Sequence, residues 1–288
     1  MWLNNVVAGL TPGATYAIVG VLLTLMSQLT RVVNFAQVAV GMFGGYISLT
    51  LVTKMHLPIF VGVVVGVLVA ALISALLGWI IATWLSEAST SARSAVTVAG
   101  LLFLISLAFI LFGYRNQPFP TLVAGPLFKL PGGAVVSKVT VVVIILAIVI
   151  TVGSWAFLKF TAFGVKLRAV SDRQMAAELL GLNVKMLNVS VWFVTGALAG
   201  ITVALVGPSA SNDYVTLSAI VIPGAAAALV GAFKRMDLAL IGGLAIGAIQ
   251  GLFAGFPNLL IIRDWVPIIF IILFLLWNQR KEVWDAAR

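Results

Sequence analysis

Long stretches of this sequence contain no charged residue, and this feature constrains the fold more than any other. Nine apolar segments, most of them close to 20 residues long, are separated by polar or basic stretches. A helix of roughly 20 apolar residues spans the hydrocarbon core of a bilayer. We therefore take as candidate membrane helices the segments at about 6–29, 32–53, 57–85, 95–113, 136–158, 188–207, 216–233, 238–255 and 264–277.

The composition excludes a soluble fold. Only 9% of the 288 residues are charged and 62% are hydrophobic, whereas a soluble domain carries about 25% charged residues. The outer surface must therefore face lipid. The net charge of +9 then reflects basic residues in cytoplasmic loops and not binding to nucleic acid. The sequence predicts an all-α polytopic membrane protein that forms a single domain over residues 1–288.

Two of the nine segments are irregular. The first contains Thr11-Pro12-Gly13, which we expect to break its helix, and the second opens with polar Asn34 and Gln37. Short spans, or spans interrupted by glycine and proline, often line cavities in transporters. Because either segment is a candidate for a re-entrant helix, we predict about nine spans, within a range of eight to ten. The N-terminus lacks the basic start of a secretory signal, so we expect the first segment to be retained.

The basic residues predict the orientation. When the loop at 159–187 is placed in the cytoplasm and the spans alternate from it, twelve of the 17 lysines and arginines face the cytoplasm. Positive charge concentrates on that side of membrane proteins, so we predict an external N-terminus and a cytoplasmic C-terminus. The basic residues predicted outside are Lys54, Arg115, Lys129, Lys138 and Arg263.

Signatures of catalysis and of ion-driven transport are missing from the sequence. The 17 basic and 8 acidic residues all fall in loops or at the ends of spans, and the single histidine, His56, falls in a predicted external loop. Carriers driven by protons or sodium usually keep buried carboxylates or histidines. There is no H-E-x-x-H zinc motif, no G-x-S-x-G elbow and no G-x-x-x-x-G-K-[ST] nucleotide loop, and there is no cysteine. We therefore predict no enzyme activity, no metal and no cofactor, and any ATP must be hydrolysed by another polypeptide.

The cytoplasmic loop contains the pattern of a short helix. Ser171 and Gln174 form a capping box, and Asp172 places negative charge at the expected helix start. Good helix formers follow, and Gly181 is a natural stop. We expect a helix of about ten residues, roughly 15 Å long. Its small residues suit close docking into a groove of a partner, but an interfacial helix lying on lipid explains the pattern equally well.

Two stretches resemble a known family. Asn34-Phe35-Ala36-Gln37, followed by Gly41-Met42 and Gly44-Gly45-Tyr46, is similar to the Asn-Phe-Ala-His…Met-x-Gly-Ala-Tyr pattern of the branched-chain amino acid ABC permeases of the LivH/LivM type. The stretch at 163–200 resembles the same family. There are departures: Gln37 replaces a histidine, the late glycine-rich turn at 230–235 is eroded, and Gln279-Arg280-Lys281 stands where the family has Arg-Pro-x-Gly.

The resemblance implies the permease subunit of an ABC importer in the bacterial inner (plasma) membrane. It implies that the loop helix is a coupling helix that docks on ABC ATPase subunits. It also implies an extracytoplasmic solute-binding protein and a second permease subunit, which is either a copy or a paralogue. The residues to which it assigns ATPase coupling are Arg168, Ala169, Asp172, Ala176, Ala177 and Gly181.

Four polar or aromatic residues are candidates for the substrate path. Asn34 and Gln37 are three residues apart and would share one helix face, where they either meet the polar groups of a solute or form interhelical hydrogen bonds. Tyr16 and Tyr46 either line the same path or anchor the protein at the membrane interface. The glycines at 243, 247 and 251 repeat every four residues, which predicts a surface for close helix packing.

The uncharged spans favour a solute without net charge, because a buried ion would meet no counter-charge. Helix ends can meet the two poles of a zwitterion, and the apolar residues suit a hydrophobic side chain. Branched-chain or other hydrophobic amino acids fit best. Urea, short amides or another small organic solute are the alternatives, and an ATP-independent channel or facilitator remains the alternative class of protein.

Overall fold

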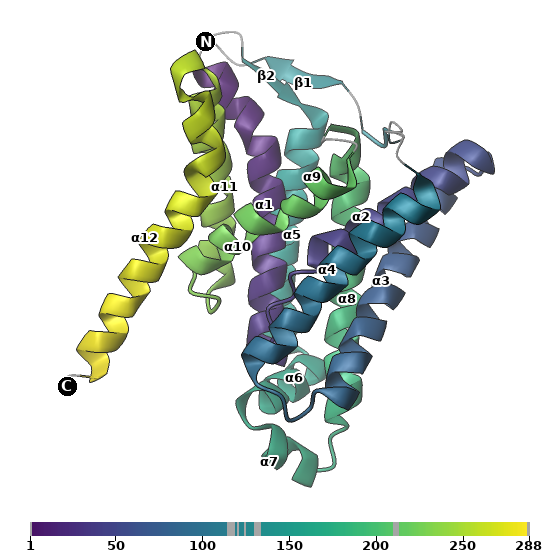
Figure 1. Cartoon of the computed structure of the whole chain (residues 1–288), viewed down its shortest axis with the longest axis vertical. Helices are drawn as coiled ribbons and strands as arrows, with labels where there is room; N and C mark the ends of the chain where they lie inside the picture. The colour runs from purple at the N-terminus through teal and green to yellow at the C-terminus, as the bar shows by residue number, and fades with distance from the viewer. Residues whose placement is uncertain are drawn as a thin grey trace. The chain divides into compact units, whose positions relative to one another are not determined.

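The computed structural model describes residues 2–113, 119, 121–123, 125–129, 134–209 and 213–286, and most of them are helical (Figure 1). The α-helices are α1 (Trp2–Thr30), α2 (Gln37–Lys54), α3 (Ile59–Trp84), α4 (Thr90–Phe112), α5 (Lys138–Phe160), α6 (Ala162–Asp172), α7 (Gln174–Leu179), α8 (Val184–Val206), α9 (Tyr214–Ala219), α10 (Val221–Val230), α11 (Met236–Ala254) and α12 (Leu260–Ala286). Two short strands, β1 (Pro126–Lys129) and β2 (Val135–Ser137), and two 3-10 turns at 207–209 and 257–259 complete the described elements.

Each of the nine predicted segments contains helix, which confirms the all-α polytopic membrane fold. Among the described residues, seven helices are long and apolar enough to cross a membrane, namely α1, α3, α4, α5, α8, α11 and α12. Of the other two segments, α2 has 18 residues and is mostly buried within the protein, and the segment predicted at 216–233 is divided into α9 and α10. The number of spans above seven therefore stays a prediction.

The contacts divide the chain into two compact units. Unit 1 contains Met1–Thr24, Ala124–Thr151 and Ile222–Arg288, and unit 2 contains Leu25–Val123 and Val152–Val221. The single membrane domain over residues 1–288 stays a prediction.

In unit 1, α1 and α11 approach each other through glycines. A Cβ atom added to Gly247 would lie 2.2 Å from the Cα of Gly13, and one added to Gly251 would lie 2.3 Å from the carbonyl oxygen of Asn5. At Gly243 the nearest atom would be the backbone nitrogen of Ala17, at 2.2 Å. These distances leave no room for any side chain, which confirms the predicted close-packing role of the glycine repeat.

The expected break at Thr11-Pro12-Gly13 is wrong, because α1 runs without interruption through Pro12. Proline removes one backbone donor, but this part of the helix is held by its neighbours. The Thr11 and Thr140 hydroxyls are hydrogen bonded at 2.6 Å, and Gly13 packs directly against the backbone of α11. Proline is tolerated in membrane helices where packing and local side chains compensate in this way.

A small antiparallel hairpin in unit 1 was not expected from an all-α prediction. Its strands β1 and β2 pair Phe128 with Val136 and Lys129 with Val135. The backbone N–H of Val135 also donates to the side-chain oxygen of Asn4 at 3.2 Å. The hairpin is short, and it leaves the helical class of the protein unchanged.

In unit 2, α2 is the central helix and packs against α3, α4, α8 and α9. Glycines again permit the closest contacts: a Cβ on Gly44 would lie 2.4 Å from the carbonyl oxygen of Gly66 in α3, and one on Gly41 would lie 2.6 Å from that of Ala199 in α8. Because α2 is surrounded by protein, its polar residues are placed where they meet other helices and not lipid.

Candidate substrate path and coupling loop

A non-helical segment connects α1 to α2. We call residues 31–36 the connecting segment. Its backbone is bonded to α4: the N–H of Val33 donates to Ser94 Oγ at 3.2 Å and that of Phe35 to Thr97 Oγ1 at 3.0 Å. The Thr97 hydroxyl in turn donates to the carbonyl of Val33 at 3.1 Å. Irregular backbone that is buried within a membrane protein requires such partners.

Asn34 and Gln37 lie side by side, but the prediction that they share one helix face is wrong. Asn34 lies in the connecting segment, and the helix starts only at Gln37. The Asn34 side-chain amide donates to Gln37 Oε1 at 2.8 Å, and Gln37 Nε2 donates to the carbonyl of Thr195 in α8 at 2.6 Å. The Asn34 side-chain oxygen accepts from the N–H of Ala36 at 3.1 Å. Both side chains are fully buried. These bonds fit the interhelical alternative, and a contact with solute stays a prediction.

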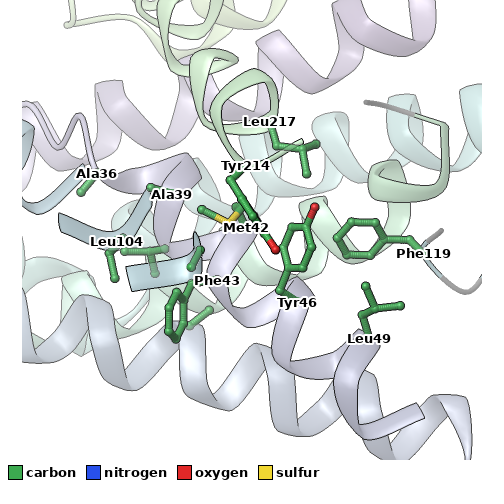
Figure 2. Close-up of a cluster of buried hydrophobic side chains, with 13 residues drawn as sticks. Ala36, Ala39, Met42, Phe43, Tyr46, Leu49, Leu104, Phe119, Tyr214 and Leu217 are labelled. Carbon is green, nitrogen blue, oxygen red and sulfur yellow. The ribbon is translucent and has the colours of Figure 1, made fainter. Parts of the chain in front are cut away.

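Tyr46 lies nine residues along α2 from Gln37, in the aromatic part of the unit 2 core (Figure 2). Its ring is 4.4 Å from that of Tyr214, 4.9 Å from Phe119 and 5.6 Å from Phe112, measured between centroids. Only 2% of Tyr46 is exposed, so it does not sit in a lipid-facing belt. The hydroxyl of Tyr214 donates to the carbonyl of Gly113 at 2.7 Å, which ties α9 to the end of α4.

Tyr16 belongs to unit 1, whereas the other three candidates belong to unit 2. It is half-buried on α1 and packs against a cluster that includes Ala227, Ile246 and Val266. These neighbours are apolar, which is compatible with a packing role. Its place on a substrate path stays a prediction.

The capping box predicted at Ser171 and Gln174 is wrong. The loop folds into two helices, and Ser171 lies in the last turn of α6, where its hydroxyl donates to the carbonyl of Arg168 at 2.9 Å. Asp172 is correspondingly at a helix end and not at a helix start. The reason is tertiary: α6 buries Leu167 and Val170, and this packing keeps the chain helical through Asp172. The helix α7 that follows has six residues, fewer than the predicted ten.

Gly181 ends the loop helix as predicted. Its φ of +79° is in the left-handed region, which glycine adopts without strain. Its N–H donates to the carbonyl of Glu178 at 2.9 Å, and the N–H of Leu182 donates to that of Ala177 at 3.1 Å. These bonds satisfy carbonyls that the helix end would otherwise leave free.

The structure separates the six candidate coupling residues into two groups. Arg168, Asp172, Ala176 and Gly181 are exposed, whereas Ala177 is buried and Ala169 is half-buried. Three large apolar residues of α7 and its C-terminus are also exposed, and the sequence analysis missed them: Met175 (78%), Leu179 (85%) and Leu180 (80%). The available signal was the presence of long apolar side chains in a loop that the sequence predicts to be cytoplasmic.

One pocket of about 120 Å³, partly open to solvent, lies in unit 2 beside the loop that contains α6 and α7. Gln174 and Glu178 of α7 line it, together with Thr30 and Val32 from the end of α1 and the connecting segment. The other walls come from the end of α3, the start of α8 and Arg93, at the end of the unit where α6 and α7 lie (Figure 1). The predicted substrate-path residues are not among those that line it.

Comparison with known proteins adds to these observations. Residues 5–277 match the model of a family described as the branched-chain amino acid transport system permease component. A protein of Methanocaldococcus jannaschii named "Probable branched-chain amino acid transport permease protein LivH" is 28% identical over 250 residues, which cover 80% of this chain and 74% of the relative.

Two bacterial relatives show similar agreement. The "High-affinity branched-chain amino acid transport system permease protein LivH" of Escherichia coli K12 is 25% identical over 267 residues (87% of this chain, 85% of the relative). The corresponding protein BraD of Pseudomonas aeruginosa is 22% identical over 261 residues (86% and 85%). A solved structure, PsaBC from Streptococcus pneumoniae in complex with Fab, has a TM-score of 0.49 and 17% identity, and the match covers 95% of this chain and 89% of that one.

The family match extends over nearly the whole chain, from the first spanning helix to the last. It includes the connecting segment with Asn34 and Gln37 and the two-helix loop between α5 and α8. The chain is therefore a multi-pass membrane protein that belongs to the family of branched-chain amino acid transport permease components.

Proposed function

We propose that this chain is the membrane-spanning subunit of an ABC importer, driven by separate ATPase subunits that dock on α7. The observation that carries the proposal is the exposed apolar surface of Met175, Leu179 and Leu180 on a loop between two helices of spanning length. Contiguous exposed apolar residues mark interaction sites. Burial of these side chains under a partner would stabilise the complex by roughly 1.5–3 kcal/mol for each fully buried side chain.

The ends of the neighbouring helices support a loop that lies outside the bilayer. Lys159, at the end of α5, places its ammonium group 4.8 Å from the ring centroid of Trp155 and 5.3 Å from that of Phe160. Lys185, at the start of α8, lies 5.0 Å from the Trp79 ring. Aromatic residues beside lysines are typical of the membrane–water interface. With the loop in the cytoplasm, the N-terminus is outside and the C-terminus is inside.

The proposed partners follow from this arrangement. ATPase subunits bind the loop, a solute-binding protein delivers the solute from the other side, and a second permease subunit, a copy or a paralogue, completes the path. The relatives whose names describe branched-chain amino acid transport support such an importer. An ATP-independent facilitator would leave the apolar surface of α7 without a partner protein.

The first prediction concerns the source of the driving energy. The pure, isolated chain should neither bind nor hydrolyse ATP, because it has no phosphate-binding loop. When it is expressed with its full set of neighbouring genes, an ABC ATPase should copurify with it. ATP hydrolysis by the isolated chain would contradict the proposal, and transport activity without any copurified ATPase would favour the facilitator.

The second prediction concerns the solute, which we propose to be a branched-chain or other hydrophobic amino acid. Among the described residues, the central parts of the spanning helices carry no charged side chain. The ion pair of Arg263 with Asp264, for instance, lies near the start of α12. A zwitterion avoids the cost of burying net charge, which is about 2.5–3.5 kcal/mol or more per ion.

Uptake of labelled leucine, urea and an aromatic amino acid should be compared in cells with and without the gene. We expect deletion to lower leucine uptake at low external concentration by about tenfold, since passive entry of a zwitterion through lipid is negligible. If leucine uptake is unchanged and urea uptake collapses, the amino acid assignment is wrong, while the proposal of an ABC importer is retained.

A further inference from the structure

Arg31 connects the end of α1 to the coupling loop. It is the first residue after α1 and has a left-handed backbone, with φ of +55°. Its guanidinium Nη2 donates to the carbonyl of Ser171 at 2.9 Å and to that of Asp172 at 3.2 Å. These are the last two residues of α6. Carbonyls at a helix C-terminus lack intrahelical partners and carry partial negative charge, so they bind a cation well.

The contact lies at the junction of α6 with α7. Only Arg173 separates the end of α6 from the first residue of α7, and its N–H still donates to the carbonyl of Ala169 at 3.2 Å. A force that moves α7 therefore acts within a few residues on the carbonyls that Arg31 holds. Both bonds come from the same nitrogen, Nη2, so a single group of Arg31 holds the two carbonyls.

Arg31 is also the first residue of the connecting segment. Val33 and Phe35 are bonded to α4, and Asn34 is bonded to Gln37 at the start of α2. Gln37 continues the series to the carbonyl of Thr195 in α8. The segment is short and hydrogen bonded along its length. We therefore expect a displacement of Arg31 to move Asn34 and Gln37 as well.

The cavity of unit 2 gives this connection room to move. It is lined by Thr30 and Val32 on either side of Arg31 in the sequence, and by Gln174 and Glu178 of α7. Packed interiors resist displacement because they have few voids. This pocket of about 120 Å³ is partly open to solvent, so α7 can shift into it without first displacing a packed side chain.

We propose that Arg31 is a positioning residue for transport, which transmits the movement of the ATPase-docked loop to the connecting segment and the start of α2. This inference rests on the proposed function, because it requires an ATPase on α7. It assigns a role to a residue outside both the candidate substrate path and the candidate coupling surface. A purely structural Arg31 would hold α6 in place without relaying nucleotide-dependent movement.

The test uses the absence of cysteine from the sequence. Val33→Cys introduces the one thiol of this chain, half-buried in the connecting segment. The variant is studied in the complete complex with its ATPase subunits in nanodiscs, and labelling of this chain is followed after the subunits are separated by denaturing electrophoresis. The rate of maleimide labelling is measured without nucleotide and after trapping with ATP and vanadate. We expect trapping to change the rate by about tenfold, as a shift between two populations of the segment would produce.

Adding Arg31→Asn should reduce that change to less than about twofold, because asparagine tolerates the left-handed backbone but lacks the guanidinium. Basal ATP hydrolysis and the yield of assembled complex should stay near those of the unmodified protein. The matched control is Lys166→Gln, which removes an exposed positive charge from α6 and should leave the labelling change intact. Arg31→Lys keeps a cationic donor and should restore most of it.

The inference is overturned if Val33→Cys labels at the same rate in both states, or if Arg31→Asn preserves the nucleotide-dependent change. If Arg31→Asn does not assemble, Arg31→Gln is measured in the same way, and a preserved change there has the same meaning. Failure of the proposed function would look different, because no ATPase would copurify with the unmodified chain. The two failures are therefore separable.

Discussion

Replacing Gly247 with valine is expected to disrupt the packing of α1 against α11 and to destabilise the protein. The first added carbon alone would lie 2.2 Å from the Cα of Gly13 and 2.5 Å from both the nitrogen of Gly13 and the carbonyl oxygen of Gly9. All three are backbone atoms, so no rotamer change can relieve the clash and the helices must separate. Overpacking costs typically 1–3 kcal/mol where side chains can adjust, and we expect more than about 3 kcal/mol here.

The measurement is thermal unfolding of the purified protein in detergent, together with its yield from membranes. Gly153→Val is the matched control: Gly153 is a helical, exposed glycine of α5 at which an added Cβ meets nothing within 4 Å. The control should unfold at nearly the same temperature as the unmodified chain. Equal stability of the two variants would show that α1 and α11 are not packed as described.

The second large effect concerns α7, the proposed docking helix. Ala176→Trp should abolish ATP-driven uptake while the protein folds normally, because Ala176 is exposed on α7 and touches the proposed partner instead of the core. A bulky side chain at a packed docking contact costs roughly 3 kcal/mol, or about 100-fold in the docking equilibrium. The measurements are uptake in cells and copurification of the ATPase.

Two further variants make this result specific. Lys166→Trp places the same side chain at an exposed site on α6 and should retain most of the uptake. Ala177→Trp acts at a position that is only 2% exposed, so it should lower the unfolding temperature of the chain itself, which Ala176→Trp should not. Normal ATP-driven uptake by the Ala176→Trp variant would refute docking through α7.

The helical class of the protein was predictable because it depends on the local composition of each segment. An apolar stretch of spanning length must form a helix in lipid, where every backbone group needs a partner within the same segment. The glycine repeat from Gly243 to Gly251 and the helix stop at Gly181 were predictable for a similar reason. In both cases the absence of a side chain is the property that matters, and it is visible in the sequence.

The hydrogen-bond partners in the candidate site were less predictable than the helices, because they come from distant parts of the sequence. Asn34 and Gln37 were recognised as polar residues at the start of a span, but only the structure shows that Thr195, 158 residues further along, accepts from Gln37. Arg31 carried no signal in the sequence, because its partners are backbone carbonyls 140 and 141 residues away. A backbone carbonyl is present at every residue, so no pattern of side chains marks it.

The errors have the same origin. Thr11-Pro12-Gly13 is a helix-breaking sequence by local propensity, yet α1 continues because Gly9 and Gly13 pack on the backbone of α11. Ser171 and Gln174 have the spacing of a helix start, yet burial of Leu167 extends α6 past that point. Local sequence determined which segments are helical and where small residues permit contact. The tertiary structure decided where helices end, which polar groups are paired and which face of the loop is left open to a partner, because these depend on packing energies that exceed local propensities.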